Sequence, residues 1–289
     1  MLFEQRSILL WLMLPSLLVL ALLTGYPLVS VLLAAVSQTD SQGASTTFVG
    51  LANFRALLDD FFFLTAVRNT LVFTLVASTS QLLLGLALAL LFYRPFAGRR
   101  WLLPLLIYPM MLSTLVCSAI WRAWYHYDSG LINRVLVACG FPAQEWLSDP
   151  DRALYAIALV DTWQWTPMAF LILLAGLQSI PREVEEAAMV DGARGWQRLW
   201  FITLPLLARP LLLVALLRSI DAFKLFDKAY VLTGGGPGNA TETLSMLVYK
   251  YGFQFFDQGL ASAAALLMLL ISITMTLVYA RYLAKGTPR

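Results

Sequence analysis

Two long apolar segments carry polar and aromatic side chains whose spacing could form a binding site. Residues 155–177 contain four of them at helical i, i+3, i+4 and i+7 positions: Asp161, Gln164, Trp165 and Met168. The end of a later segment repeats this spacing with Arg218, Asp221, Ala222 and Leu225. Residues spaced in this way lie on one face of a helix. An ionisable residue at the centre of a membrane helix costs about 2.5–3.5 kcal/mol on insertion, so such residues usually mark function.

These side chains are suited to recognising a solute rather than to breaking a bond. An indole ring can stack on the apolar face of a sugar, while carboxylate, guanidinium and amide groups can hydrogen-bond the hydroxyls. Thr114 is a weaker candidate, because hydroxyls in membrane helices often bond back to their own helix. A structural alternative stays open: Trp165 could be an interfacial anchor, and Arg218 and Asp221 could be an i, i+3 pair that neutralises itself.

The sequence predicts no metal site, bound cofactor or nucleotide-binding loop in this chain. Cys117 and Cys139 are separated by 22 positions, and His126 is the single histidine. A structural metal site needs about four such ligands. The glycine-rich run 234–238 lacks the GxxxxGK[ST] pattern of a phosphate-binding loop.

The composition is that of a polytopic membrane protein. Of 289 residues, 60% are hydrophobic and 13% are charged, whereas a soluble domain has about 25% charged residues. The net charge of +3 is spread over short loops. No basic block indicates a nucleic-acid partner.

Six stretches approach or exceed the roughly 20 residues that a helix needs to cross a bilayer. They are Ile8–Val36, Asn69–Phe92, Leu103–Ile120, Tyr155–Leu177, Leu204–Ala222 and Leu260–Tyr282. No alternating segments of a transmembrane barrel are present, so the predicted fold class is all-α. We divide the chain into an N-terminal span with the first outer loop (1–65) and a core transmembrane region (66–289).

The basic residues of the loops predict the orientation. One set of short segments holds ten of them: Arg6, Arg94, Arg99, Arg100, Arg182, Arg194, Arg198, Arg281, Lys285 and Arg289. The loops on the opposite side (37–68, 121–154 and 223–259) are longer and hold nine basic residues, with His126 included. The positive-inside rule therefore places both termini and the loop 178–203 in the cytoplasm.

The loop 179–205 contains a short acidic helix. Pro181 suits the first helical position, and three glutamates then load the first turns, where the helix dipole favours negative charge. Asp191-Gly192 predicts the stop, since glycine accepts a left-handed conformation, and a second amphipathic segment follows over 194–202. Helices that lie on headgroups are usually rich in Lys and Arg, so a groove on a soluble partner fits better.

The same loop resembles a known family. Glu186-Ala187-Ala188, three residues, Gly192, nine residues, Ile202, one residue and Leu204-Pro205 follow the EAA loop of ABC importer permeases. Asp191 and Ala193 fit the fuller form found in the carbohydrate-importing branch. The stretches 232–237 and 49–54 also resemble that branch.

The resemblance implies a type I ABC importer permease fold with six transmembrane helices, in the cytoplasmic (inner) membrane of a bacterium or archaeon. It implies four kinds of partner: a second permease subunit, expected to be a different chain, two ATP-binding subunits, an extracytoplasmic solute-binding protein and the lipid bilayer. ATP and Mg would be bound by the ATPase, and the solute would be a sugar or a sugar-like molecule moved by alternating access. The residues that match the ATPase-coupling motif are Glu186, Ala187, Ala188, Asp191, Gly192 and Ala193.

Two other classes of protein remain as alternatives. An ion-coupled secondary transporter is expected to show inverted repeats and broken helices, and the two halves of this chain do not resemble each other. A membrane-embedded enzyme needs clustered acids, metal ligands or a nucleophile–base pair. Asp149 and Asp151 come nearest, without evident partners. The identity of the solute stays open.

Overall fold

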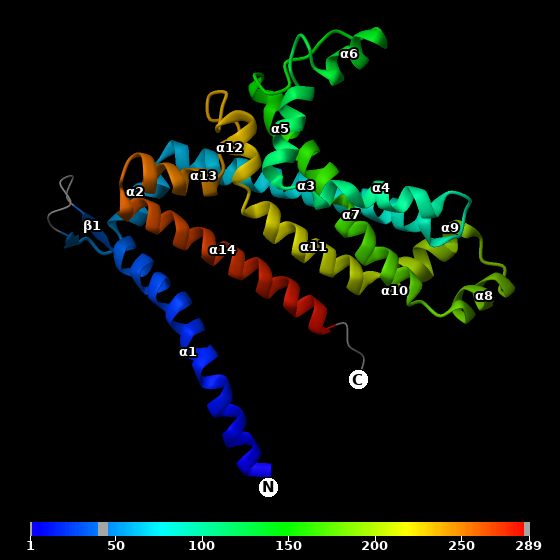
Figure 1. The fold of residues 1–289 in the computed structure, drawn as a ribbon, viewed down its shortest axis with the longest axis horizontal. Coiled ribbons are helices and arrows are strands. Elements are labelled where there is room, and N and C mark those ends of the chain that lie inside the picture. Colours follow the sequence, from blue (N-terminus) through cyan, green and yellow to red (C-terminus); the bar gives the residue numbers. More distant parts are fainter. Residues whose placement is uncertain (1, 40–45, 286–289) are drawn as a thin grey trace. The chain divides into compact units, whose positions relative to one another are not determined.

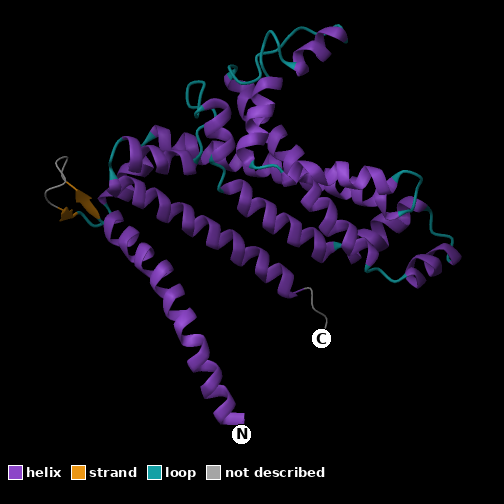
Figure 2. Cartoon of the chain, in the orientation of Figure 1, coloured by secondary structure: helices purple, strands orange, loops and turns teal. Residues whose placement is uncertain are grey.

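Helices make up nearly all of the computed structural model, which describes residues 2–39 and 46–285 (Figure 1 and Figure 2). The α-helices are α1 (Leu2–Ala35), α2 (Ala52–Asp59), α3 (Phe61–Tyr93), α4 (Arg99–Met111), α5 (Thr114–Trp124), α6 (Leu131–Ala138), α7 (Pro150–Gln178), α8 (Arg182–Val190), α9 (Gly195–Arg198), α10 (Leu204–Leu206), α11 (Ala208–Phe223), α12 (Asp227–Thr233), α13 (Leu244–Tyr249) and α14 (Gln258–Lys285). Two π-helical turns span Leu199–Thr203 and Lys250–Gln254.

One small sheet is added to the predicted all-α fold. Strands β1 (Ser37–Thr39) and β2 (Thr46–Phe48) pair antiparallel, with Ser37 opposite Phe48 (Figure 2).

In the described part of the chain, four helices are long and apolar enough to cross a membrane: α1, α3, α7 and α14. These helices contain the predicted first, second, fourth and sixth spans, except that α1 ends one residue before Val36. Two bent helix pairs raise the number to as many as six. Arg289, one of the residues used for the orientation, lies outside the described residues.

The prediction of one continuous helix over Leu103–Ile120 is wrong. Helices α4 and α5 meet at 101° across Leu112 and Ser113. Pro109 has no amide hydrogen to donate within α4. Ser113 is extended and caps α5, since its hydroxyl accepts a hydrogen bond from the Val116 amide at 3.4 Å.

The predicted fifth span, Leu204–Ala222, is also not one straight helix. The run Gly195–Leu206 meets α11 at 64° around Leu207. Prolines flank this point: Pro205 lies in α10 and Pro210 in the first turn of α11. A proline is tolerated in a first turn but interrupts the hydrogen bonding of a longer helix.

The chain divides into two compact units, and the first comprises Met1–Phe63 and Leu247–Leu270. Within it, Asn53 of α2 bonds to the end of α1 and to β1, because its amide nitrogen donates to the carbonyls of Ala35 and Ser37, both at 2.9 Å. The hydroxyl of Tyr251 also bonds to the carboxylate of Asp60. None of the most apolar stretch of α1 is buried in the described structure.

The second unit comprises Leu64–Met246 and Ile271–Arg289, and α7 runs through its centre. In α7, 67% of the most apolar stretch is buried, against 28% in α3. Helices α4, α5, α11 and α12 pack against α7. Gly176 permits α11 to approach α7 closely, since a Cβ atom there would lie 2.7 Å from Cγ of Pro210. Within this unit, α8 lies at one end, and α5 and α12 lie toward the other (Figure 1).

Candidate functional site

Three buried charged side chains from different helices meet in the second unit. Asp161 of α7, Arg218 of α11 and Lys228 of α12 are 4%, 1% and 2% exposed. Oδ2 of Asp161 lies 3.4 Å from Nη2 of Arg218, and its Oδ1 bonds to Nζ of Lys228. One carboxylate therefore serves two buried cations. We call these residues, together with Gln81, the charged cluster.

Gln81 joins the charged cluster from a fourth helix, α3, and is fully buried. Its Oε1 accepts from Nε of Arg218 at 2.6 Å, and its Nε2 donates to Oδ2 of Asp161 at 2.8 Å. Burying an ion costs several kcal/mol unless partners and hydrogen bonds satisfy it. Gln81 supplies a partner to both Asp161 and Arg218 and holds α3 against α7 and α11.

Arg218 makes two more contacts at the edge of the cluster. Its Nη1 lies 3.1 Å from Oδ2 of Asp221, whose side chain is 57% exposed. Its guanidinium also stands over the ring of Trp165, 4.8 Å from the centroid, a geometry in which the ring face attracts the cation. The predicted Arg218–Asp221 pair is thus present, as part of a larger network.

A pocket of about 270 Å³ opens beside the charged cluster. Its lining comprises Thr114, Asp161, Trp165, Arg218, Asp221, Lys224, Leu225, Phe226, Asp227 and Lys228. Six of the eight residues proposed for the solute path therefore lie together, drawn from α5, α7, α11 and the turn that follows α11. We call this cavity the central pocket.

The other two residues of the predicted set, Gln164 and Met168, are not in this lining. Gln164 is 1% exposed, and its Nε2 donates to the carbonyl of Leu112 at 2.9 Å. That bond fixes the break between α4 and α5 to α7. Met168 is half-buried farther along α7.

Aromatic side chains close the same end of the second unit. Trp163 packs against Trp121 and Trp124, with centroids 5.6 and 6.4 Å apart. Tyr125, just beyond α5, donates its hydroxyl to the carbonyl of Ala156 at 3.0 Å, and burial raises the pKa of this phenol. These rings brace α5 against α7 beside the central pocket.

Sequence reasoning missed Gln81 and Lys228. Gln81 is the sole amide in the run 71–92 of α3, a signal that could have marked it. Lys228 gives no such signal, because it lies in a separate short helix, α12, and only the packing of α12 against α7 brings it to Asp161.

The loop after α7 forms the predicted acidic helix, α8, and ends as predicted at Asp191-Gly192. Gly192 has a φ of +78°. The amide of Ala193 bonds to the carbonyl of Ala188 at 2.9 Å, and that of Gly192 to Met189 at 3.1 Å, as in a glycine-terminated Schellman motif. Pro181 lies just before the helix, one position earlier than predicted.

The surface of α8 divides into two sides. Ala188 is buried at 7%, and Ala193 is half-buried. The exposed residues include Glu186, Ala187, Asp191 and Gly192, together with the apolar Met189 and Val190, which are 51% and 87% exposed. The predicted coupling residues thus lie mostly on an open surface that combines small, apolar and acidic groups.

Comparisons with known proteins agree with this architecture. The family described as "Binding-protein-dependent transport system inner membrane component" matches residues 81–286. The trehalose/maltose transport permease MalF of Thermococcus litoralis is 41% identical over 80% of this chain and 78% of its own length. The sulfoquinovosyl glycerol transport permease SmoG of Agrobacterium fabrum is 36% identical over 96% of this chain and 90% of its own.

A solved structure supports the fold. A chain of a bacterial ABC transporter that imports the acidic polysaccharide alginate superposes with a TM-score of 0.84 at 21% identity, covering 98% of both chains. A related chain, crystallised in complex with an alginate-bound periplasmic protein, gives a TM-score of 0.82 and covers 95% of this chain and 93% of its own.

These findings decide between the classes left open by the sequence. A secondary transporter and a membrane enzyme are both excluded, and the chain itself is a permease without a catalytic role. Members of this family typically bind no cofactor. The chain belongs to the inner-membrane permease components of binding-protein-dependent ABC importers.

Proposed function

We propose that this chain forms half of the channel of an ATP-driven sugar importer, with both termini in the cytoplasm. A second permease chain, expected to differ in sequence, completes the channel. Two ATP-binding subunits bind on the cytoplasmic side, and a solute-binding protein docks outside. ATP and Mg belong to the ATPase subunits. Residues 66–289 form the core, and residues 1–65 supply an additional span and an outer loop.

The exposed surface of α8 is the observation that carries this proposal. Small side chains let a partner approach closely, and the exposed Met189 and Val190 offer apolar contact. Helix α7 rises about 25 Å between Asp161 and Gln178, so α8 begins far from the central pocket. In the proposed cycle, closure of the ATPases moves α8, and the second unit relays this motion to the pocket. ATP hydrolysis then returns the pocket to the cytoplasmic side, in an alternating-access cycle.

Helix α1 has the composition of a helix that lies in the membrane. None of its most apolar stretch is buried in the described structure. Lipid or the second permease chain can cover such a surface, because apolar side chains favour an apolar surrounding over water.

The central pocket supports an uncharged, hydroxyl-rich solute. It is lined by three carboxylates and three cationic groups, those of Asp161, Asp221, Asp227, Arg218, Lys224 and Lys228. The buried cations already have carboxylate partners, so an anionic solute finds no unpaired charge among them. Relatives named for trehalose and maltose transport agree with such a solute, whereas the relative SmoG is named for an anionic one, sulfoquinovosyl glycerol.

Replacing Trp165 by alanine is expected to raise the KM of solute uptake. The substitution removes the ring over which Arg218 stands in the pocket lining and leaves Phe226 as the other ring there. Stacking on an aromatic face is worth about 1 kcal/mol. The measurement is uptake of radiolabelled trehalose or maltose by proteoliposomes. Trp101→Ala, which removes a highly exposed ring elsewhere, is the control. An equal change of the KM in both variants would contradict a contact between Trp165 and the solute.

Replacing Glu186 by lysine is expected to abolish co-purification with the ATPase subunits and the hydrolysis that the binding protein stimulates. The substitution reverses a charge on the open side of α8. Glu145→Lys is the matched control, because it makes the same change at another exposed acid in a loop assigned to the opposite side. Gly192→Pro should act like Glu186→Lys. Normal assembly and turnover in both α8 variants would refute the proposed coupling role.

A further inference from the structure

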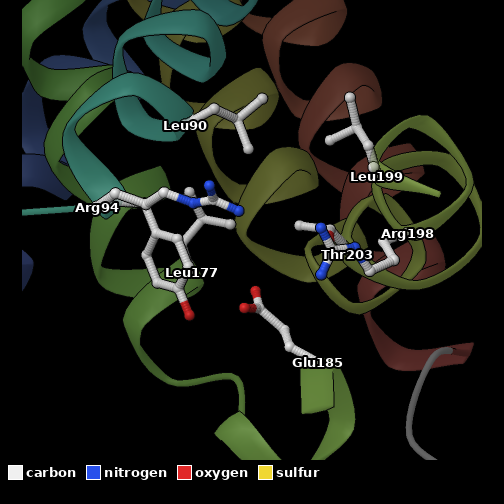
Figure 3. Close-up of a pocket in the computed structure, with 9 residues that line it drawn as sticks. Leu90, Arg94, Leu177, Glu185, Arg198, Leu199 and Thr203 are labelled. Atoms are coloured by element: carbon white, nitrogen blue, oxygen red, sulfur yellow. The ribbon is translucent and has the colours of Figure 1, made fainter. Parts of the chain in front are cut away.

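A second cavity lies behind α8, separate from the central pocket. It has a volume of about 280 Å³ and is lined by Leu90, Tyr93, Arg94, Leu177, Glu185, Gly195, Arg198, Leu199 and Thr203. These residues come from the ends of α3 and α7, from α8, and from α9 with the π-helical turn after it. We call it the α3–α8 pocket. Figure 3 shows the carboxylate of Glu185 pointing from α8 toward the guanidinium groups of Arg94 and Arg198.

The α3–α8 pocket carries a surplus of positive charge. Arg94 and Arg198 face the single carboxylate of Glu185, which interacts with the phenol of Tyr93. In the described part of the chain, neither arginine is within ion-pair distance of a carboxylate. Arg218 and Lys228 of the charged cluster, in contrast, are fully paired. One positive charge of the α3–α8 pocket is therefore left without a partner.

An adjoining cavity of about 610 Å³ extends this basic surface. It shares Tyr93, Arg94 and Glu185 with the α3–α8 pocket and adds Arg99 and Arg182, against Glu186. The positive surplus therefore persists toward the open side of the loop. Arg100, the immediate neighbour of Arg99, belongs to neither lining, and its guanidinium stands over the ring of Trp101 at 5.1 Å.

The apolar part of the lining narrows the choice of ligand. Leu90, Leu177 and Leu199 lie next to the two arginines (Figure 3). Two candidate membrane-spanning helices, α3 and α7, end here at Tyr93 and Gln178. In the cytoplasmic orientation proposed above, on which this inference rests, the headgroups of the inner leaflet would reach this cavity. A free phosphate ion would leave the leucines uncovered. A phospholipid covers both parts, with its phosphodiester on the arginines and its glycerol and upper acyl carbons on the leucines.

We propose that the α3–α8 pocket binds the headgroup of an anionic phospholipid from the cytoplasmic leaflet. A lipid with one net negative charge, such as phosphatidylglycerol, neutralises the surplus charge. A zwitterionic lipid does not. Basic pockets between membrane helices on the cytoplasmic side suit such headgroups, and each basic residue near the surface contributes about 1 kcal/mol.

The bound lipid would also act on the coupling helix. Glu185 belongs to α8, whereas Arg94 follows α3 and Arg198 closes α9, so the ligand is enclosed only while α8 keeps this position. By linkage, a lipid that prefers this arrangement also stabilises it. The lipid composition of the inner leaflet would therefore affect how strongly ATP hydrolysis is coupled to transport.

The test is native mass spectrometry of the purified full-length chain, titrated with phosphatidylglycerol or phosphatidylcholine. Arg94→Gln and Arg198→Gln are each expected to weaken phosphatidylglycerol binding about five-fold, the equivalent of about 1 kcal/mol. Arg100→Gln, the matched control, should leave it unchanged. Glu185→Gln should strengthen binding, a gain that misfolding cannot produce.

Three results would overturn the proposal. An equal loss in Arg100→Gln and Arg94→Gln would mean that the lipid is held by general attraction to basic loops. Equal binding of phosphatidylcholine would remove the role of the surplus charge. Displacement of the lipid by equimolar inorganic phosphate would make a free anion the occupant. Because the titration measures lipid binding and not transport, its outcome is independent of the proposed coupling to an ATPase.

Discussion

Asp161→Ala is expected to destabilise the folded chain by about 3–5 kcal/mol, the usual cost of removing one partner of a buried ion pair. The substitution leaves Arg218 and Lys228 buried at 1% and 2% exposure. Arg218 keeps Gln81 and Asp221 as partners. In the described structure, Asp161 is the carboxylate that pairs with Lys228, so the main penalty comes from that lysine.

Thermal unfolding of the purified chain measures this effect. A loss of this size lowers the apparent Tm by roughly 10 °C in a chain of this length. Asp221→Ala is the control, because its side chain is 57% exposed and water can replace much of its interaction. Its effect on the Tm should be clearly smaller.

A compensating variant separates the charge effect from a packing effect. Replacing Lys228 by methionine in the Asp161→Ala background removes the orphaned cation while keeping most of the side-chain volume. The double variant should recover a large part of the lost Tm, as expected for two residues in contact. No recovery, or a loss in Asp161→Ala equal to that in Asp221→Ala, would contradict the shared-carboxylate interpretation.

The charged cluster illustrates what periodicity can predict. Asp161 and Trp165 lie on one face of α7 because their helix is regular, and Arg218, Asp221 and Leu225 follow from α11 in the same way. Gln164 has the correct spacing but bonds to the carbonyl of Leu112. Helical spacing identifies a face, whereas the break in a neighbouring helix decides what each residue on that face meets.

The two helix breaks are the features of the fold that hydropathy predicts least well. Hydropathy averages over a window, so the segments 103–120 and 204–222 look continuous although they bend by 101° and 64°. Their prolines were visible in the sequence, but a proline is compatible with a kink, a first turn or a complete break. The hydroxyl of Ser113, which caps α5, and the tertiary packing around Gln164 determine which of these occurs.

The acidic loop was more predictable because its signals are local. A proline at the start, glutamates in the first turns and a glycine at the end each act within one helical turn. The structure places the ends of α8 within one residue of this expectation. These local signals do not predict the α3–α8 pocket. That pocket forms only because the ends of α3 and α7 come together beside Glu185.

Gly192→Val is expected to abolish ATP-coupled uptake while leaving the membrane helices folded. A Cβ atom at this position would meet no neighbouring atom within 4 Å, so any effect must come from the backbone, where φ is +78°. A left-handed conformation costs a residue with a side chain about 1–2 kcal/mol, and a β-branched residue is especially unsuited to it. The chain should therefore abandon the turn that joins Ala188 to Ala193, and α8 would lose its defined end.

Gly192→Asn is the matched control, because asparagine tolerates the left-handed region far better than valine. ATP hydrolysis and solute uptake are measured in proteoliposomes that contain the complete importer, together with the amount of ATPase subunit that co-purifies. We expect the asparagine variant to retain most of the coupled activity and the valine variant to lose it. The Tm should be the same for the two variants. If the two variants behave alike, the left-handed turn at Gly192 does not position α8. The exposed side chains of the helix would then have to account for coupling on their own.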